Sequence, residues 1–184
     1  MGVLLAMRVH SLFAAPAVAF LVAGCAIPTP PPAPSPPPST SAGAGARASR
    51  YSGAEAQIFD LINAERQHQG LPALVYNAQL DEMAKIQAAN MARLQKMAHT
   101  LPESQLPTLG DRARFVGYPF GRMAENVAHG YPSAESVVRG WMNSSGHRNN
   151  VLNADVSETG IGIARAPGGG LYFCQVFGRR LTSI

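Results

Sequence analysis

The feature that most constrains this chain is a proline-rich segment that separates two unlike stretches of sequence. Eight of the eleven residues 28–38 are proline, and a stretch rich in Ser, Ala and Gly follows as far as Ala48. Proline fixes φ and removes a backbone donor, so this segment predicts an extended polyproline-like spacer followed by a flexible one. We therefore divide the chain into residues 1–25, a linker over residues 26–50 and one folded domain over residues 51–184.

Residues 1–25 have the pattern of a bacterial export signal. Arg8 is followed by an apolar run from Leu12 to Val22 that Pro16 interrupts. This run is marginal in length for a bilayer span. A start at Met7 would give a more regular signal than a start at Met1, and both remain open.

The apolar run ends in a sequence that resembles the lipobox of bacterial lipoproteins, Leu21-Val22-Ala23-Gly24-Cys25. In a lipobox the cysteine is acylated and becomes the new N-terminus, so the resemblance predicts lipidation at Cys25 and a membrane as a partner. The alternative is an ordinary cleavage site beside an incidental cysteine. If Cys25 is acylated, Cys174 is expected to be an unpaired core cysteine; the alternative is a Cys25–Cys174 disulfide. The protein is expected to be exported, and either lipid-anchored to the cell membrane or extracellular or periplasmic.

The charge of the chain argues against nucleic acid as a partner. The formal net charge is +4, and removing Arg8 with the signal leaves +3. The basic residues are scattered rather than gathered into a stripe that could follow a phosphate backbone. We expect a monomer that does not bind nucleic acid.

The folded part begins with segments of helical periodicity. A capping-box pattern at Ser52 starts an expected helix that Gly70 ends. A second helix is expected from about Asn77 to Ala98, with one apolar face. Ser133 is expected to cap a third helix, and Ser144 or Ser145 a short fourth helix that ends near Leu152. Between the second and third, residues 100–122 are expected to form a long irregular loop of the kind that often serves function or acts as a lid.

The chain closes with the pattern of a β-hairpin. Residues 160–164 and residues 171–177 are strand-like, and a Pro-Gly-Gly-Gly turn over residues 167–170 joins them. Helices first and strands last indicate an α+β fold in which helices pack on a small antiparallel sheet.

Several segments, in this order, resemble the bacterial branch of the CAP superfamily, which comprises cysteine-rich secretory proteins, antigen 5 and pathogenesis-related proteins of group 1. The resemblance covers about residues 54–178, and the segment from Trp141 to Leu152 is its most specific part. It implies an α-β-α sandwich with a groove on one face. The matching segments are residues 58–66, 97–99, 117–118, 124–127, 141–152, 160–162 and 172–177.

In eukaryotic members the groove is lined by two histidines and two glutamates, and the resemblance implies only half of that set here. The first histidine falls on His99 and the first glutamate on Glu125. The second glutamate position holds Ser144 and the second histidine position holds Tyr172. The bacterial pattern adds His147. The resemblance therefore implies a ligand groove formed by His99, Glu125, His147, Ser144 and Tyr172.

These residues allow more than one chemistry. His99 and Glu125 could tie the loop to the helices, or, together with His147, bind a divalent metal such as zinc. Ser144, Ser145 and His147 also suggest a nucleophile, but serines before a short helix are far more often N-caps. No catalytic residue is assigned, and no cofactor is required.

The sequence is compatible with three functions. The first is a non-enzymatic, membrane-tethered module that binds a lipid, glycan or protein of the cell envelope or the extracellular space. The second is a hydrolase that uses a metal-activated water with Glu125 as general base. The third is a purely structural envelope protein. Stoichiometric zinc, with loss of activity on chelation, would favour the second hypothesis.

Overall fold

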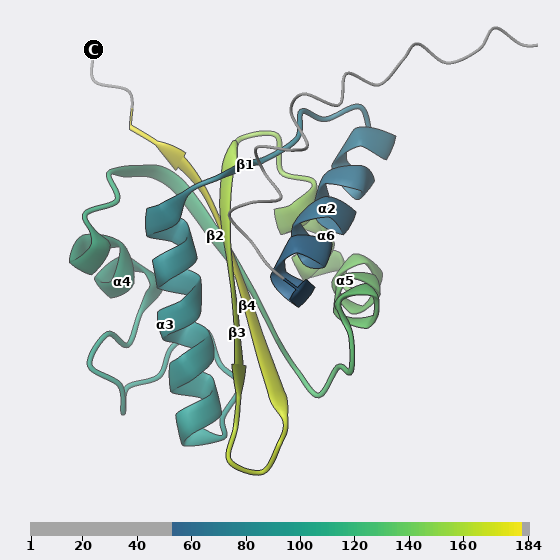
Figure 1. The fold of residues 1–184 in the computed structure, drawn as a ribbon. Coiled ribbons are helices and arrows are strands. Elements are labelled where there is room, and N and C mark those ends of the chain that lie inside the picture. Colours follow the sequence, from purple (N-terminus) through teal and green to yellow (C-terminus); the bar gives the residue numbers. More distant parts are fainter. Residues whose placement is uncertain (1–52, 182–184) are drawn as a thin grey trace, which may run out of the picture. The chain divides into compact units, whose positions relative to one another are not determined.

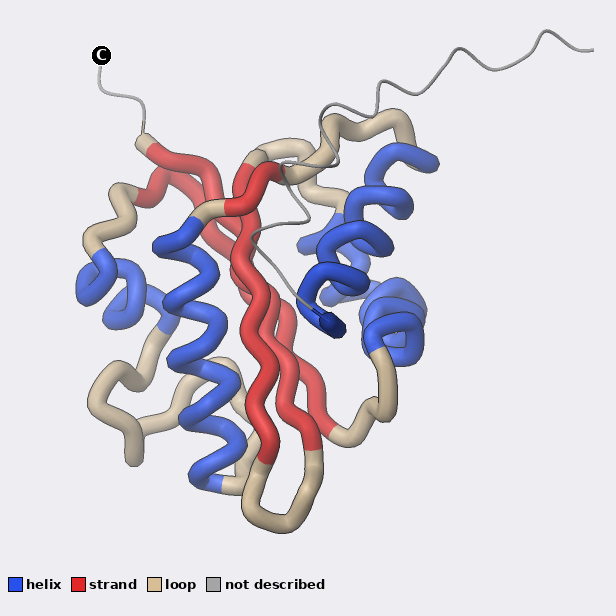
Figure 2. The backbone as a smooth tube through the Cα atoms, in the orientation of Figure 1, coloured by secondary structure: helices blue, strands red, loops and turns tan. Residues whose placement is uncertain are grey.

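The computed structural model describes residues 53–181, which form helices on both faces of one sheet (Figures 1 and 2). The signal, the proposed lipidation site Cys25 and the linker lie outside the described residues. The helices are α2 (Gly53–His68), α3 (Ala78–Leu94), α4 (Leu109–Val116), α5 (Ala134–Asn143) and α6 (Ser145–Val151). The strands are β1 (Val75–Tyr76), β2 (Phe120–His129), β3 (Glu158–Arg165) and β4 (Leu171–Arg180).

The four strands are arranged in the order β1-β3-β4-β2. The expected hairpin is confirmed, because β3 and β4 pair antiparallel with Ile163 opposite Phe173. β2 pairs antiparallel with the other side of β4 and forms one edge of the sheet. β1 adds a short parallel pairing with β3, so the sheet is mixed. The expected α+β sandwich is confirmed, with β1 and β2 as strands that the sequence patterns did not predict.

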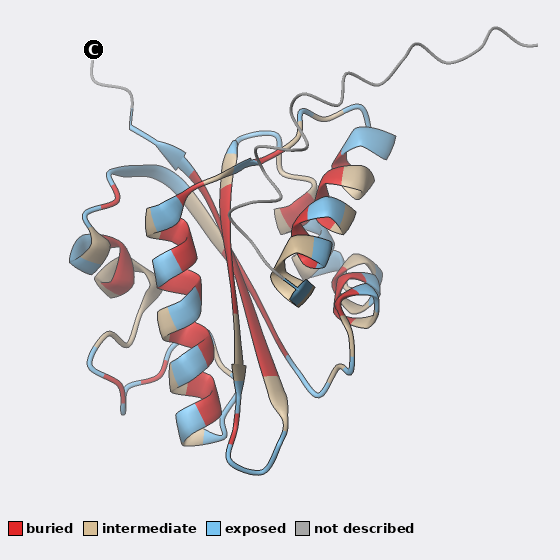
Figure 3. Cartoon of the chain, viewed as in Figure 1, coloured by how far each residue is buried: buried red, intermediate tan, exposed pale blue. Residues whose placement is uncertain are grey.

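Each face of the sheet carries its own apolar core (Figure 3). α2, α5 and α6 cover one face, where Ile58, Trp141 and Phe173 are buried together. α3 and α4 cover the other face, where Leu80, Met91 and Val176 are buried. Because β-strand side chains alternate between faces, successive residues of β4 serve different cores.

Local signals set most helix boundaries. Asn77 caps α3 by accepting from the backbone N–H groups of Gln79 and Leu80, at 2.9 and 3.1 Å. Ser133 caps α5 within a capping box. The start of α3 near Asn77 and the cap of α5 at Ser133 agree with the sequence prediction, whereas α3 ends at Leu94 and not at Ala98. Within residues 53–181, no helix combines the length and the hydrophobicity that a bilayer crossing needs.

Residues 100–122 are more regular than we expected. They contain α4, which starts at a capping box formed by Thr108 and Asp111 and ends at Gly117. Gly117 adopts φ 67°, a left-handed conformation that glycine reaches without a Cβ clash. The many Pro and Gly residues of this region therefore flank a short helix, and the prediction of a wholly irregular loop was wrong.

Candidate functional site

His99 and Glu125 meet although 26 positions separate them. His99 follows the end of α3, and Glu125 lies in the middle of β2. His99 Nδ1 lies 3.0 Å from Glu125 Oε1. The segment after α3 is held in place because Gln87 Nε2 donates to the backbone oxygen of Ala98, at 2.6 Å. The structure thus brings together the two residues that the resemblance had placed in one groove.

A fully buried arginine holds the other oxygen of Glu125. Arg112 of α4 donates from Nη2 to Glu125 Oε2, and from Nη1 to Gln87 Oε1 at 2.6 Å. The Cys174 thiol donates to the same Glu125 oxygen, at 3.5 Å. Both carboxylate oxygens of Glu125 are therefore engaged by other side chains. Cys174 is buried, as expected, and it forms no disulfide within residues 53–181. Burial, followed by the charge of Glu125, raises the pKa of its thiol.

The Glu125 contact orients His99. A carboxylate only accepts hydrogen bonds, so Nδ1 of His99 carries a proton and donates it. Among residues 53–181 no hydrogen-bond partner is seen for the other ring nitrogen, Nε2. The hydrogen bond to Glu125 raises the pKa of His99, against a smaller opposing effect of partial burial. His99 thus presents one nitrogen on an imidazole whose side chain is 58% exposed while its partner Glu125 is 3% exposed.

His147 reaches the same region from α6, which is fastened to the edge strand β2 by amides. Asn126 Nδ2 donates to the backbone oxygen of His147 at 3.1 Å. Asn150 Nδ2 donates to Asn126 Oδ1 at 2.9 Å and to the backbone oxygen of Glu125 at 3.3 Å. Burial lowers the pKa of His147, and the charge of His99 lowers it further. His147 is therefore the histidine of the pair that favours the neutral form.

A cavity of about 230 Å³ lies between the edge of β2 and the helices α5 and α6. Apolar groups form much of it, including the ring of Trp141, whose Nε1 donates to the backbone oxygen of Val127 at 3.4 Å. His147, Ser144 and His129 bring polar atoms. The full lining is Met97, Val127, Ala128, His129, Tyr131, Gly140, Trp141, Ser144 and His147.

Ser144 and Tyr172, two of the predicted groove residues, do not lie together: one lines the cavity and the other is in a core. Ser144 lines the cavity at the junction of α5 and α6, at the N-cap position of α6, but its side chain makes no capping hydrogen bond. Tyr172 is 4% exposed and belongs to the core under α3, with its ring stacked 4.2 Å from that of His129. Tyr172 therefore does not line the cavity, but it contacts His129, which does.

Nothing in the geometry assembles a serine nucleophile. Among residues 53–181 no hydrogen bond joins Ser144 or Ser145 to His147, so the pairing that activates a nucleophile is not seen. Ser144 joins α5 to α6, and Ser145 is the first residue of α6, so both serve the helix junction.

The donor set is also a poor match for zinc, which takes three protein ligands plus water, or four. Of the three candidates, His99 and His147 could each offer a ring nitrogen to a metal. The carboxylate of Glu125 is less available, because it already accepts hydrogen bonds from three donors. Within residues 53–181 no group of three or more His, Cys, Asp and Glu side chains is arranged to hold a metal ion. We derive no metal-dependent step.

Sequence reasoning missed several residues of this site. Met97 is 53% exposed and lines the cavity. Arg112, His129 and Tyr131 carried no local motif. One signal was present for Arg112, because it shares a helical face with Leu109 and Val116, but α4 itself was not predicted.

Comparison with known proteins places this arrangement in a family. The family model of the cysteine-rich secretory protein family, CAP, matches residues 59–177. YkwD of Bacillus subtilis (strain 168) is 34% identical over 134 residues, 71% of this chain and 49% of that protein. The membrane protein YlbC of the same organism is 32% identical over 127 residues, 69% of this chain and 35% of that protein. The chain thus spans about half or less of these curated relatives.

Solved structures agree. An extracellular SCP-domain protein from Bacillus anthracis str. Ames superposes with a TM-score of 0.63 at 32% identity, covering 70% of this chain and 41% of that one. An outer surface protein from Borrelia burgdorferi has a TM-score of 0.62 at 24% identity, covering 67% of this chain and 90% of that one, and shows the shared fold. By sequence and by fold, this chain belongs to the cysteine-rich secretory protein (CAP) family.

Proposed function

We propose that this protein is an exported, membrane-tethered CAP module that binds a lipid, glycan or protein ligand of the envelope or its surroundings. The cavity at the edge of β2 is the binding site, with His147 and Ser144 in its wall. His99 does not line the cavity, but it lies near enough to His147 for its charge to lower the pKa of that residue. Ligand sites are concave and mostly apolar, with a few placed polar groups, and this cavity has that composition.

The engagement of Glu125 is the observation that supports binding over hydrolysis. A general base must be able to accept a proton from a water or a substrate. Both oxygens of Glu125 already accept hydrogen bonds from His99, Arg112 and Cys174. In the proposed function Glu125 is a positioning residue, which holds the His99 ring so that Nε2 can meet a ligand.

Relatives support the location outside the cytoplasm. The Bacillus anthracis relative is described as an extracellular protein, and YlbC as a membrane protein. For this chain we propose export by residues 1–25 and anchoring through acylated Cys25. Two acyl chains anchor a protein stably, whereas one gives only marginal binding.

The anchor is tested by mass spectrometry of the mature N-terminus and by membrane fractionation. The expected result is a diacylated or triacylated Cys25 and a protein in the membrane fraction. The Cys25→Ser variant should lose the acyl mass. An unmodified Cys25, or cleavage at another position, would contradict the anchor while leaving the binding proposal intact.

Binding is tested by native mass spectrometry of the full chain purified from its own membranes. We expect a co-purifying mass that is lost or reduced in the His99→Ala and His147→Ala variants. His68→Ala is the matched control, because His68 is an exposed histidine at the end of α2. A co-purifying mass that is the same in all variants, or no mass at all in the wild type, would count against this site and favour a structural role.

A further inference from the structure

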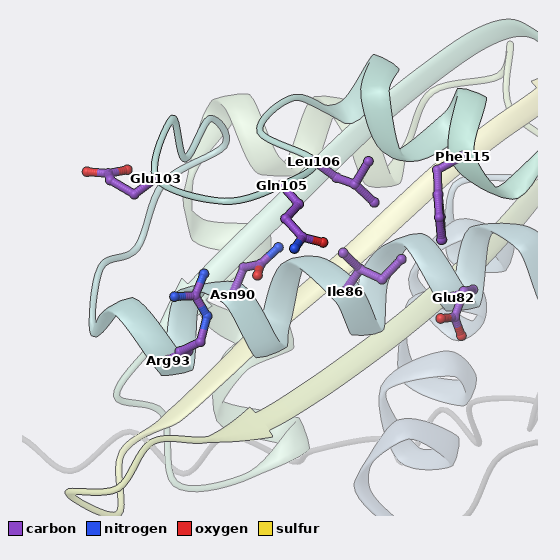
Figure 4. A pocket seen from close by; sticks show the side chains of 8 residues that line it. All are labelled: Glu82, Ile86, Asn90, Arg93, Glu103, Gln105, Leu106 and Phe115. Atoms are coloured by element: carbon purple, nitrogen blue, oxygen red, sulfur yellow. The ribbon is translucent and has the colours of Figure 1, made fainter.

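A second, larger cavity lies on the opposite face of the sheet, away from the site just described. It has a volume of about 590 Å³ and lies between the outer face of α3, the loop after α3 and α4 (Figure 4). That volume falls within the range of ligand sites. The loop that forms its far wall belongs to the segment that we expected to serve function or act as a lid.

One straight stripe of α3 forms the floor of this groove. Glu82, Ile86, Asn90 and Arg93 follow one another at spacings of four, four and three, which places them on one face of the helix. The buried stripe of α3, which includes Leu80, packs on the sheet instead. α3 therefore serves two surfaces, the core with one face and the groove with another.

The far wall is held in shape by its own hydrogen bonds. The N–H of Leu101 donates to the backbone oxygen of Pro107 at 3.0 Å, which closes the loop between them. The Ser104 hydroxyl donates to the backbone oxygen of Leu101 at 2.8 Å, and Leu101 is fully buried. The groove is thus formed before any ligand arrives, which lowers the entropic cost of binding.

The groove is apolar in the middle and oppositely charged at its ends. Figure 4 shows Ile86 and Leu106 in the centre, with Arg93 at one end and Glu82 at the other, where Phe115 also lies. Phe115 is 67% exposed, a large apolar side chain without cover. Within residues 53–181 no salt bridge engages Arg93 or Glu82, whereas Glu103 points away and pairs with Lys96 at 3.0 Å. Both end charges are therefore available to a partner.

Two further features favour a peptide over a simple amphiphile. Asn90 and Gln105 each offer an amide that donates and accepts, as a peptide backbone requires. A second hollow of about 490 Å³ shares Gln105, Leu106 and Phe115 with the first and extends to Asp111 and Arg114 of α4. An extended peptide points alternate side chains to opposite sides, so it could fill both hollows across the Leu106–Phe115 ridge.

We propose that this groove binds an extended peptide segment of a partner protein, with an acidic residue against Arg93, apolar residues over Phe115 and a basic residue against Glu82. Eleven positions on a helix separate the end charges by ~16 Å. At about 3.4 Å per residue, an extended segment of roughly five residues spans that distance.

The test uses the full chain in phosphatidylcholine nanodiscs and a fluorescent, end-blocked peptide Glu-Leu-Ala-Leu-Lys, with binding read by fluorescence anisotropy. Two analogues replace the Glu or the Lys of the peptide by Gln. We expect Arg93→Gln to weaken the parent peptide about twofold to fivefold, as exposed ion pairs do, and to leave the analogue without Glu unchanged. Glu82→Gln should show the same selectivity toward the Lys of the peptide.

Phe115→Ala should weaken the parent peptide and both analogues about tenfold, because it removes a large exposed apolar side chain from the groove. Phe120→Ala and Arg139→Gln are the matched controls, since both residues are exposed and neither lines the groove. No saturable binding, or losses that are independent of the peptide's charges, would overturn the proposal. Sodium decanoate that binds with Arg93 dependence while the peptide does not would assign the groove to an anionic amphiphile. Self-association in sedimentation that Phe115→Ala abolishes would assign it to a second copy of the chain.

Discussion

Arg112 and Glu125 form an ion pair between two side chains that are 0% and 3% exposed. Removing two charges from water is costly, and their attraction repays that cost only when the geometry is good and further hydrogen bonds complete it. Here Gln87, His99 and Cys174 supply further hydrogen bonds, while Arg112 Nε is left without a partner among residues 53–181. The pair links α4, β2 and the segment after α3, and so fixes the border of the candidate site.

Breaking this pair should destabilise the domain strongly. Arg112→Met leaves a buried carboxylate and Glu125→Gln leaves a buried guanidinium, so each should cost about 3–5 kcal/mol in the free energy of unfolding. The double variant should cost less than the sum of the two single changes, because it removes both charges. Urea unfolding measures all three. Single costs below about 1 kcal/mol would show that the pair does not hold the site together.

His99 should contribute stability that depends on pH. Its pKa is raised in the folded protein, chiefly by the hydrogen bond to Glu125. A raised pKa gives stability that is fully present below the unfolded pKa, about 6.5, and is lost as pH rises through the folded value. The gap in urea midpoint between wild type and His99→Gln should therefore be wider at pH 5.5 than at pH 8.5. The gap at pH 5.5 should stay modest, because His99 is largely exposed.

A second measurement tests the electrostatic effect of His99 on the neighbouring His147. The pKa of His147 is lowered first by burial and then by the charge of His99. In the His99→Gln variant an NMR titration should show the pKa of His147 moving up toward its ordinary value without reaching it, because burial remains. An unchanged pKa for His147 would show that the two imidazoles do not sense each other.

Arg66 is a buried cation that binds backbone oxygens. It is 1% exposed, and its guanidinium donates to the backbone oxygens of Pro72, Val151 and Asn153 at 3.0, 2.7 and 2.9 Å. Arg66→Met should cost at least about 3 kcal/mol, because charged hydrogen bonds contribute about 1.5–3 kcal/mol each. Arg66→Lys should recover part of the loss, since an ammonium group cannot reproduce the planar fork. Chemical denaturation measures both, with the exposed Arg139→Met as control. An Arg66→Lys protein as stable as wild type would contradict the role of the fork.

The sequence predicted most of the elements whose signals are local, but it did not predict α4, whose capping box of Thr108 and Asp111 is also local. Asn77 and Ser133 indicated α3 and α5 because caps act within three residues, and the hairpin followed from its turn. β2 was missed because Glu125 and Asn126 interrupt its apolar pattern. Their polarity makes sense only with tertiary partners, Arg112 on one face and α6 on the other.

The site also combines residues with a recognisable sequence signal and residues that only tertiary contacts explain. The pairing of His99 with Glu125 came from the family resemblance and not from spacing, since 26 positions separate the two residues. The buried Arg112 and the exposed Met97 could not be predicted, because burial is decided by how α4 and the loop fold back over the sheet. Local motifs can be recognised in the sequence, whereas the tertiary contacts of a residue cannot be predicted from its sequence neighbours.

Gly160 is required by the close approach of α3 to β3. A Cβ at Gly160 would lie closer than 3.0 Å to the backbone nitrogen of Asp81, and a Cβ at Gly162 would also lie closer than 3.0 Å to the backbone carbon of Ala84. These obstacles are backbone atoms, so no side-chain rotation can relieve them. Gly160→Ala should push α3 off the sheet and cost about 1–3 kcal/mol or more. Gly146→Ala is the matched control, because a Cβ there meets nothing within 4 Å and alanine favours the helix α6 by about 1 kcal/mol. Thermal unfolding should therefore show a lower midpoint for Gly160→Ala and an unchanged or higher one for Gly146→Ala. A Gly160→Ala protein as stable as wild type would mean that α3 and β3 can separate without cost.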